Sequence, residues 1–286
     1  MSRQPHGILP EAPPTRNAFI ATPLPIEREL KRLFRRLDAR IVFDIGSCEG
    51  EDAIRYAALF PSAVVYAVEP VPSNLRLIEE NLARHPESHV KVLPCALSDS
   101  AGQATLFVSS GQPDDVTPSD WDYGNKSSSL RPPDRHLEVH PWVRFDDQIV
   151  VATTTLERVC RDEGISVIDF VHLDVQGAEL EVLRGAGPYL EQIGAIWMEV
   201  EAIPLYQAQP LKPDVERFMA GHGFRKMVDT VGSISGDQLY FNPRLVRPRP
   251  DRLGAAGRWL VSARATGRRA ARRLLRRGPR APGVAA

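Results

Sequence analysis

The stretch "FDIGSCEG", Phe43 to Gly50, carries the strongest signal of fold in the sequence. A short apolar run contains one acid, Asp44, and then breaks into a turn bounded by Gly46 and Gly50, after which acids open a helical pattern. Glycine lets the backbone turn sharply and approach a ligand closely. A strand, a glycine turn and a helix in this order are typical of α/β proteins that bind a ligand at the strand ends.

Apolar runs and helical patterns alternate along most of the chain. We expect strands at about 41–46, 63–69, 90–97, 167–174, 194–201, 224–229 and 236–242, with a short extra strand at 102–109. We expect helices at about 50–60, 72–84, 154–163, 178–191 and 213–222. This alternation predicts an α/β fold with a mainly parallel seven-stranded sheet and helices on both faces. The last two strands, with no helix between them, predict an antiparallel edge hairpin.

Composition divides the chain into three parts. Residues 1–40 are an N-terminal extension, proline-rich at first and then helical in pattern, and residues 41–243 form the α/β domain. Within that domain, 111–148 has no clear period, and so long a connection is usually a lid or a binding loop. Residues 244–286 form a tail with thirteen arginines and one acid.

The bulk properties favour a cytoplasmic protein. The 286 residues have no formal net charge, no apolar run long enough to span a membrane, and no apolar secretion signal at the start. The arginine-rich tail could dock peripherally on an anionic membrane surface, or it could be a solvated tail. Nucleic-acid binding is unlikely on this pattern, since only Trp259 in the tail could stack on bases.

The three cysteines Cys48, Cys95 and Cys160 are too few and too widely spaced for a disulfide framework or a zinc cluster. We expect them to be small buried residues.

A second carboxylate, Glu69, is expected to lie near the glycine turn. Glu69 ends the next expected strand, and strand ends converge at the ligand site of an open α/β sheet. There it can accept hydrogen bonds from the hydroxyls of a ribose. Pro70 follows it, lacks an N–H donor, and can form an apolar wall for the base.

The spacing of the glycines separates two classes of cofactor. A dinucleotide fingerprint needs glycine at its first, third and sixth positions, but counting from Gly46 the third and sixth are Cys48 and Glu51. Acids at the start of the helix would also repel a pyrophosphate. They are compatible with a sulfonium cofactor, which has no phosphate and carries positive charge. The turn therefore favours S-adenosylmethionine over a dinucleotide; an ordinary strand-to-helix turn is the alternative.

Several longer stretches resemble one family. "FDIGSCEG", "YAVEPVPSNLRLIEENL", "IDFVHLDVQGAELEVLRGA" and "MEVEAIPLYQAQPL" are similar to the FkbM-type family of S-adenosylmethionine-dependent methyltransferases, over about residues 41 to 242. The resemblance implies a class I methyltransferase (Rossmann-like) fold for 41–243. It also implies bound S-adenosylmethionine and, most often, methylation of a hydroxyl on a sugar, a glycan or a natural-product small molecule.

The resemblance also implies a set of cofactor contacts. The methionine moiety would be lined by Asp44, Gly46, Ser47 and Gly50, the ribose held by Glu69, the adenine by Ala96 and its neighbours, and the amino-acid end or the site floor by Asp174. The family frequently has lysine where this chain has His172.

Polar residues on two later strands point to the catalytic group. With a period of two, His172, Asp174 and Gln176 share one strand face, and Glu199 and Glu201 share a face of the next strand. Methyl transfer needs in-line alignment, and an alcohol acceptor benefits from a general base. We expect His172 to be that base, oriented by Asp174 or Glu199. A histidine merely paired with a carboxylate is the alternative.

Two further hypotheses concern the metal and the acceptor. Asp174, Glu199 and Glu201 could bind magnesium and acidify a diol acceptor, although they could equally face solvent or a cation. Ser128 and Ser129, in the serine run of the long loop, and Tyr206, just past the fifth strand, are candidates for binding the acceptor. The serines could also be ordinary loop residues.

Two functions from other classes stay open at this point. One is a nicotinamide-dependent oxidoreductase, which the glycine spacing argues against. The other is a non-catalytic, membrane-docked binding protein on the same fold.

Overall fold

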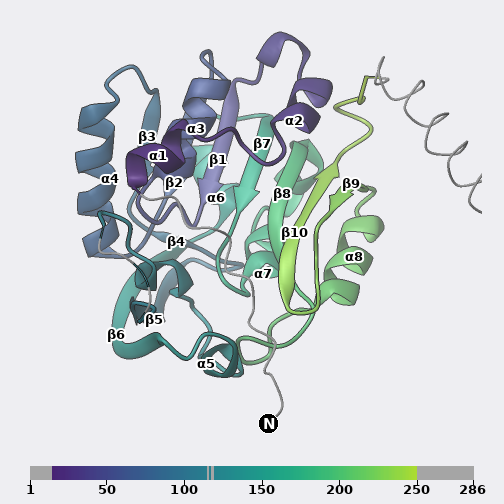
Figure 1. Ribbon diagram of the computed structural model, residues 1–286. Coiled ribbons are helices and arrows are strands. Elements are labelled where there is room, and N and C mark those ends of the chain that lie inside the picture. The colour runs from purple at the N-terminus through teal and green to yellow at the C-terminus, as the bar shows by residue number, and fades with distance from the viewer. Residues whose placement is uncertain (1–14, 115, 117–118, 250–286) are drawn as a thin grey trace, which may run out of the picture. The chain divides into compact units, whose positions relative to one another are not determined.

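A seven-stranded sheet forms the centre of the computed structural model, which describes residues 15–114, 116 and 119–249 (Figure 1). Its strand order is β3-β2-β1-β7-β8-β10-β9. The strands are β1 (Ile41–Ile45), β2 (Val64–Val68), β3 (Val90–Leu93), β7 (Ile168–Leu173), β8 (Ile193–Glu201), β9 (Arg225–Asp229) and β10 (Ser235–Phe241). The first five run parallel, and β10 is antiparallel to both β8 and β9. The predicted sheet and its antiparallel edge hairpin are confirmed.

Helices cover both faces of this sheet. On one face, α2 (Glu27–Leu33) and α3 (Glu51–Leu59) bury Leu30 and Tyr56 against Phe170 and Trp197 of the sheet. Helix α4 (Pro72–Arg84) lies beside α3. The other face packs against α6 (Leu156–Asp162), α7 (Glu179–Arg184), the short 3-10 helix η3 (Gly187–Gln192) and α8 (Lys212–Gly221). Burial on both faces explains why the central strands are almost continuously apolar.

A second, three-stranded sheet follows β3, in the order β4-β6-β5. It consists of β4 (Ala96–Leu97), β5 (Gly102–Gly111) and β6 (Val143–Thr154). The strand expected at 90–97 is therefore wrong as a single element. It is interrupted at Pro94 and Cys95, where proline cannot donate to a ladder, and its end joins the second sheet.

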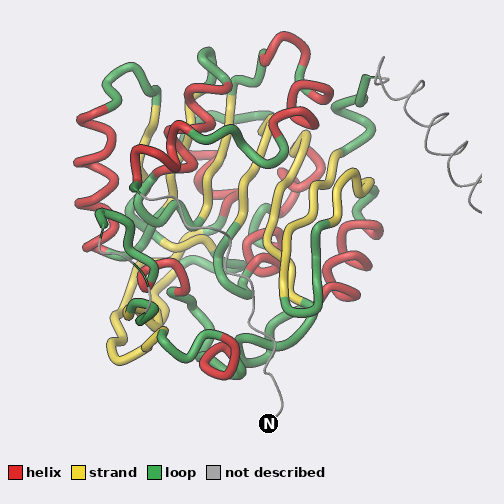
Figure 2. Tube along the Cα trace, viewed as in Figure 1, coloured by secondary structure: helices red, strands yellow, loops and turns green. Residues whose placement is uncertain are grey.

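The long connection expected at 111–148 is shorter and more structured than predicted. It contains the short helices η2 (Gly124–Ser127) and α5 (His136–Val139), and it ends where β6 begins at Val143. Figure 2 shows the segment between β5 and β6 as mostly loop interrupted by short helices. The start of β6 is polar and largely exposed, so its sequence has no buried face; pairing with β5 stabilises it instead.

Two expected helices are each divided. The helix expected at 178–191 ends at Arg184, because Gly187 has a positive φ of 51° and Pro188 follows; η3 continues from there. The helical pattern before residue 40 divides into α2 and the 3-10 helix η1 (Arg35–Leu37). A further helix, α1 (Arg16–Ala21), has no counterpart among the expected elements.

The described residues up to Arg247 form one compact unit. Most of the arginine-rich tail lies outside the described residues, and with it the predicted membrane contact. Among the residues described, no helix has both the length and the hydropathy to cross a membrane.

Gly46 marks the point where β1 and β7 end side by side. Its φ is +84°, and a Cβ placed on it would lie 1.7 Å from the carbonyl oxygen of Asp174. The backbone N–H of Asp174 in turn donates to the carbonyl of Ile45 at 3.0 Å. No side chain fits between these two strand ends, so the approach requires glycine.

This close approach gives a matched pair of substitutions. Gly46→Ala adds a clash with fixed backbone to the cost of a positive φ, and we expect it to lower the free energy of unfolding by about 4 kcal/mol or more. Gly164→Ala has the same kind of φ, +66°, but nothing within 4 Å of the new Cβ. It should cost only about 1–2 kcal/mol. Urea denaturation of both variants measures the difference; equal losses would refute the steric argument.

Candidate cofactor and acceptor site

One pocket lies where the carboxyl ends of β1, β2 and β7 meet. Its cavity volume is about 180 Å³, and it opens to solvent at its mouth. The predicted site residues that line it are Asp44, Gly46, Ser47, Glu69, Pro70, Ala96, Ser128, Ser129, His172 and Asp174. Four others, Gly50, Glu199, Glu201 and Tyr206, are not part of its wall.

The first turn is fixed by its own backbone. The N–H groups of Gly46 and Ser47 both donate to the carbonyl of Val68, at 3.0 and 3.1 Å, and the Ser47 hydroxyl donates to Asp44 at 2.5 Å. Gly50 has a φ of +78° and caps the start of α3, and a Cβ placed on it would point toward Ile78. Gly50 therefore shapes the turn from behind instead of lining the pocket.

Glu69 is held in place by three donors. Its carboxylate accepts from the N–H of Cys48 at 2.9 Å, the N–H of Val71 at 2.8 Å and the Asn74 amide at 3.3 Å. A carboxylate has about four acceptor positions, so one remains for a ligand hydroxyl. Burial raises the pKa of Glu69 to about 7, although these hydrogen bonds oppose the rise.

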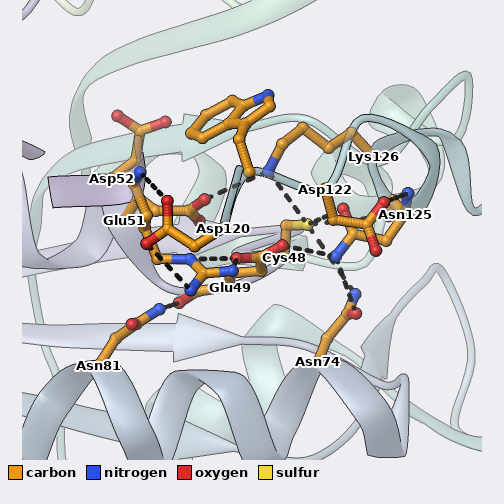
Figure 3. A network of polar contacts seen from close by, with 12 residues as sticks. Cys48, Glu49, Glu51, Asp52, Asn74, Asn81, Asp120, Asp122, Asn125 and Lys126 are labelled. Carbon is orange, nitrogen blue, oxygen red and sulfur yellow. Dashed lines mark hydrogen bonds and ion pairs between the residues drawn. The ribbon is translucent and has the colours of Figure 1, made fainter. Parts of the chain in front are cut away.

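Part of the long connection expected at 111–148 packs onto this turn. We call residues 119–131 the strap. Its Lys126 pairs with Glu51 at 3.2 Å and lies 4.2 Å above the ring of Trp121, and its Asn125 donates to Glu49 at 2.8 Å. Figure 3 shows Asn125 and Lys126 of the strap meeting the turn, while from α4 Asn74 reaches toward Asn125 and Asn81 toward Glu49 of the turn.

Helix α1 completes the cover on the same side. Arg16, buried within it, forms an ion pair with Glu49, and its N–H donates to Asp120 of the strap at 2.9 Å. The ring of Phe19 packs against Trp121 at 4.9 Å, and both rings line the pocket. Neither segment has a periodic pattern that could have revealed this role.

These contacts change one argument made from the sequence. The acids of the turn were expected to repel a pyrophosphate, but each has a cationic partner. Glu49 pairs with Arg16, Glu51 with Lys126, and Asp52 with Arg55 at 2.6 Å. The turn is therefore less negative than its sequence indicates. The argument against a dinucleotide now depends on the glycine spacing alone.

His172 lies on the pocket wall with a partner that was not expected. Its Nδ1 lies 2.7 Å from Asp44, which is also its neighbour in the pairing of β1 with β7. The expected partners, Asp174 and Glu199, form no hydrogen bond with it among the described contacts. Burial lowers the pKa of His172, but the hydrogen bond and charge of Asp44 outweigh it, and the pKa rises to about 9. At neutral pH this histidine is a cation and a poor base.

Asp174 and Glu199 are joined by a glutamine. The amide of Gln176 donates to Asp174 at 2.7 Å and to Glu199 at 2.6 Å, and its oxygen lies 2.8 Å from the Tyr206 hydroxyl. Tyr206 is fully buried and lies outside the pocket wall, where it supports this group; the acceptor contact expected for it stays a prediction. Gln176 lies beyond the end of β7 with a φ of +56°, so the period of two does not apply to it.

The two serines have different positions. Ser129 is buried, and its hydroxyl donates to the carbonyl of Gln176 at 2.7 Å, which ties the strap to the end of β7. Ser128 lies against Ser109, with 3.2 Å between the two hydroxyl oxygens. Both line the pocket, but Ser129 already has an intramolecular partner.

Burial and neighbouring acids raise the pKa of Glu199 and of two carboxyls near the Asp174–Glu199 pair. Burial, followed by the charge of Asp174, raises the pKa of Glu199 well above its usual range, that of Glu201 to about 7 and that of Asp237 to about 6. Across the described part of the chain, no group of three or more metal-ligating side chains is arranged to hold a metal ion. The magnesium hypothesis therefore finds no support in this geometry.

The cysteines are free and only partly as expected. Cys160 is buried, whereas Cys48 and Cys95 are half-buried and line the pocket.

S-adenosylmethionine fits the residues present. Gly46 leaves bare backbone at the strand crossing, Glu69 keeps one acceptor position for a ribose hydroxyl, and Asp174 offers a carboxylate on the opposite wall. Apolar side chains suited to an adenine line the part of the pocket beside Glu69: Pro70, Val71, Ala96, Leu97 and Leu106. The pocket thus has a polar end at β1 and β7 and an apolar end beyond β2.

Comparison with known proteins gives a consistent result. The family model "Methyltransferase FkbM domain" matches residues 44–226. A curated relative, "2-O-methyltransferase NoeI" of Sinorhizobium fredii, is 31% identical over 223 residues, which are 78% of this chain and 87% of the relative. "Methyltransferase sdnD" of Sordaria araneosa is 27% identical over 205 residues, 64% of this chain and 73% of that protein.

A solved structure is also similar, the FkbM methyltransferase of Methylobacillus flagellatus. It is 15% identical with a TM-score of 0.46, and the match covers 79% of this chain. The chain spans 50% of the length of that structure's chain.

The raised pKa of Glu69 predicts a pH dependence of cofactor binding. A ribose hydroxyl needs the charged carboxylate as its acceptor, so affinity should rise as pH increases through about 7 and level off above it. Isothermal titration with S-adenosylhomocysteine from pH 6 to 8.5 measures this. Glu69→Gln should bind more weakly and lose the pH dependence; an unchanged profile would show that Glu69 does not contact the ligand.

Proposed function

The chain belongs to the FkbM methyltransferase family, and from this premise we propose that it methylates a hydroxyl of a sugar, a glycan or a natural-product small molecule. The observation that carries the proposal is the carboxylate of Asp174 on the pocket wall, linked through Gln176 to the carboxylate of Glu199 behind the wall. A hydroxyl acceptor is the kind of substrate that needs such a base. The similarity to a 2-O-methyltransferase supports the same acceptor class.

The residues of this chain have distinct tasks in the reaction. When bound, S-adenosylmethionine supplies an electrophilic methyl group. The glycine turn and Asp44 hold its methionine end, Glu69 holds the ribose, and the apolar end of the pocket accepts the adenine ring. The strap and α1 exclude water from the same space. Such fixed alignment supplies much of the rate in a displacement reaction.

We assign the role of general base to the carboxylate pair of Asp174 and Glu199, and not to His172. Asp174 lies on the pocket wall, and burial raises the pKa of Glu199 toward the range where a carboxylate can accept a proton from an alcohol acceptor. His172 keeps its own proton at neutral pH. Its positive charge holds Asp44, as a lysine at that position would.

The other functions considered have less support. A nicotinamide-dependent oxidoreductase and a non-catalytic binding protein both disagree with membership of a methyltransferase family. Magnesium would need a set of ligands that the described residues do not assemble.

An acceptor screen tests the proposal. We would supply S-adenosylmethionine with methyl glycosides of neutral sugars, nucleotide-linked sugars, aliphatic natural-product alcohols and simple phenols, and score release of S-adenosylhomocysteine. Turnover with one of the aliphatic hydroxyl classes is expected. Turnover with phenols alone, or failure to bind S-adenosylhomocysteine, would overturn the proposal.

Glu199→Gln tests the assignment of the base. We expect kcat to fall by about 100-fold or more, the usual contribution of a general base. The dissociation constant for S-adenosylhomocysteine should stay unchanged, because Glu199 is not on the pocket wall. Glu163→Gln, which removes an exposed carboxylate paired with Lys91, is the matched control and should keep full activity. Equal kcat in the two variants would exclude the assignment.

Substitutions at His172 distinguish two roles for this residue, a fixed positive charge and a general base. If the charge is what matters, His172→Lys keeps most of the activity at pH 7, whereas His172→Ala leaves Asp44 without its partner and loses most of it. In the wild type the cation is present below a pKa of about 9 and lost above it, so kcat/KM should fall above pH 9. Lysine should move this decline to higher pH. A pH profile from 6 to 10.5 measures both, and inactivity of His172→Lys would favour the base.

A further inference from the structure

We propose that Gln176 is a positioning residue for the reaction: its amide holds the carboxylates of Asp174 and Glu199 in one geometry and favours the charged form of Glu199 for proton transfer. The inference rests on the proposed function, in which that pair is the base. The geometry is direct, since Nε2 of Gln176 lies 2.7 Å from Asp174 and 2.6 Å from Glu199. No substrate or cofactor atom needs to touch Gln176 for this role.

The chemistry of the amide suits this position. A side-chain NH₂ has two hydrogens, one for each carboxylate, and two ionised carboxylates can only accept. The reverse orientation would place the amide oxygen against both of them. The oxygen instead lies 2.8 Å from the hydroxyl of Tyr206, which can donate to it. The neighbours therefore fix which end of the amide faces the pair.

The backbone of Gln176 is held as firmly as its side chain. Its φ of +56° lies in the left-handed region, which residues other than glycine seldom adopt. The Ser129 hydroxyl donates to its carbonyl at 2.7 Å, and Glu179 accepts from the N–H groups of Val175 and Gly177, each at 3.1 Å. Strained backbone that is fixed from several sides is common at functional sites.

The electrostatic surroundings explain why a donor is needed there. Titratable groups face the pair from three strands, from α7 and from the loop that carries Tyr206, and all but one of them are acids. The titratable groups that face it are His172 on β7, Glu201 on β8, Asp237 on β10, Glu179 on α7 and Tyr206. In this set only His172 is a cation, and it is paired with Asp44. Without the Gln176 amide, two carboxylates would meet with no hydrogen-bond donor between them.

Hydrogen bonds to a carboxylate favour its charged form, which sets the direction of the effect. Removing the donor should raise the pKa of Glu199 further, so Glu199 would stay protonated to a higher pH. A base works only when deprotonated. The acid limb of kcat/KM should therefore move to higher pH when Gln176 is replaced by an apolar residue.

Gln176→Met tests this shift directly. Methionine is unbranched and close in length, and it bears the same cost at a positive φ as any non-glycine residue. In protein labelled with ¹³C at the glutamate carboxyls, the Glu199 signal is assigned by its loss in Glu199→Gln. We expect its titration midpoint to rise by about one to two pH units in Gln176→Met.

Gln238→Met is the matched control. Gln238 is also a buried glutamine with several side-chain partners, Glu216, Asp229 and Tyr240, but it lies on the opposite side of β10 from Asp237. This variant should leave the Glu199 midpoint unchanged. If Gln176→Met does not fold, Tyr206→Phe removes the hydroxyl that orients the amide, and a rise of the midpoint in the same direction is expected.

Activity measured with the acceptor found in the screen completes the test. The acid limb of Gln176→Met should shift with the titration midpoint, and kcat should approach the wild-type value at high pH. A uniform loss at every pH, or an unmoved midpoint, would overturn the role of Gln176. Full activity of Glu199→Gln would instead overturn the assignment of the base, so the two failures are distinguishable.

Discussion

The close parallel pairing of β1 with β7 is the constraint on which the site depends. It places Asp44 beside His172 and brings Gly46 against the backbone of Asp174, so that the cofactor turn and the catalytic strand end meet at one point. A side chain at residue 46 would force the two strand ends apart. The cation at His172 also makes a buried Asp44 tolerable, since an unpaired buried charge is costly.

Charge at the pocket is balanced by segments distant in sequence. Arg16 from α1 and Lys126 from the strap neutralise Glu49 and Glu51, and the same two segments place Phe19 and Trp121 on the pocket wall. The cover and the neutralising charges are therefore one structure. On the other side of the pocket, Ser129 joins the strap to Gln176, so the strap contacts both the glycine turn and the residue that links the carboxylate pair.

The sheet, its edge hairpin and most of the cofactor wall could be predicted because each depends on local signals. Buried strands are apolar runs, glycines mark the turn, and Glu69 ends a strand that must finish at the same edge. The errors occur where the pattern is weak. The first half of β6 is largely exposed, Pro94 divides one expected strand, and the partner of His172 depended on strand order, which periodicity does not give.

The sequence by itself determined the α/β fold, the family and many of the residues that line the pocket, because hydrophobic periodicity and a glycine turn can be recognised in consecutive residues. Only the tertiary structure decided the chemistry of those residues. Whether His172 is a base or a cation, and whether the acids of the turn are free or paired, depends on Asp44, Arg16 and Lys126. Ionisation is set by the groups within a few ångströms, and chain folding brings those groups together from distant positions.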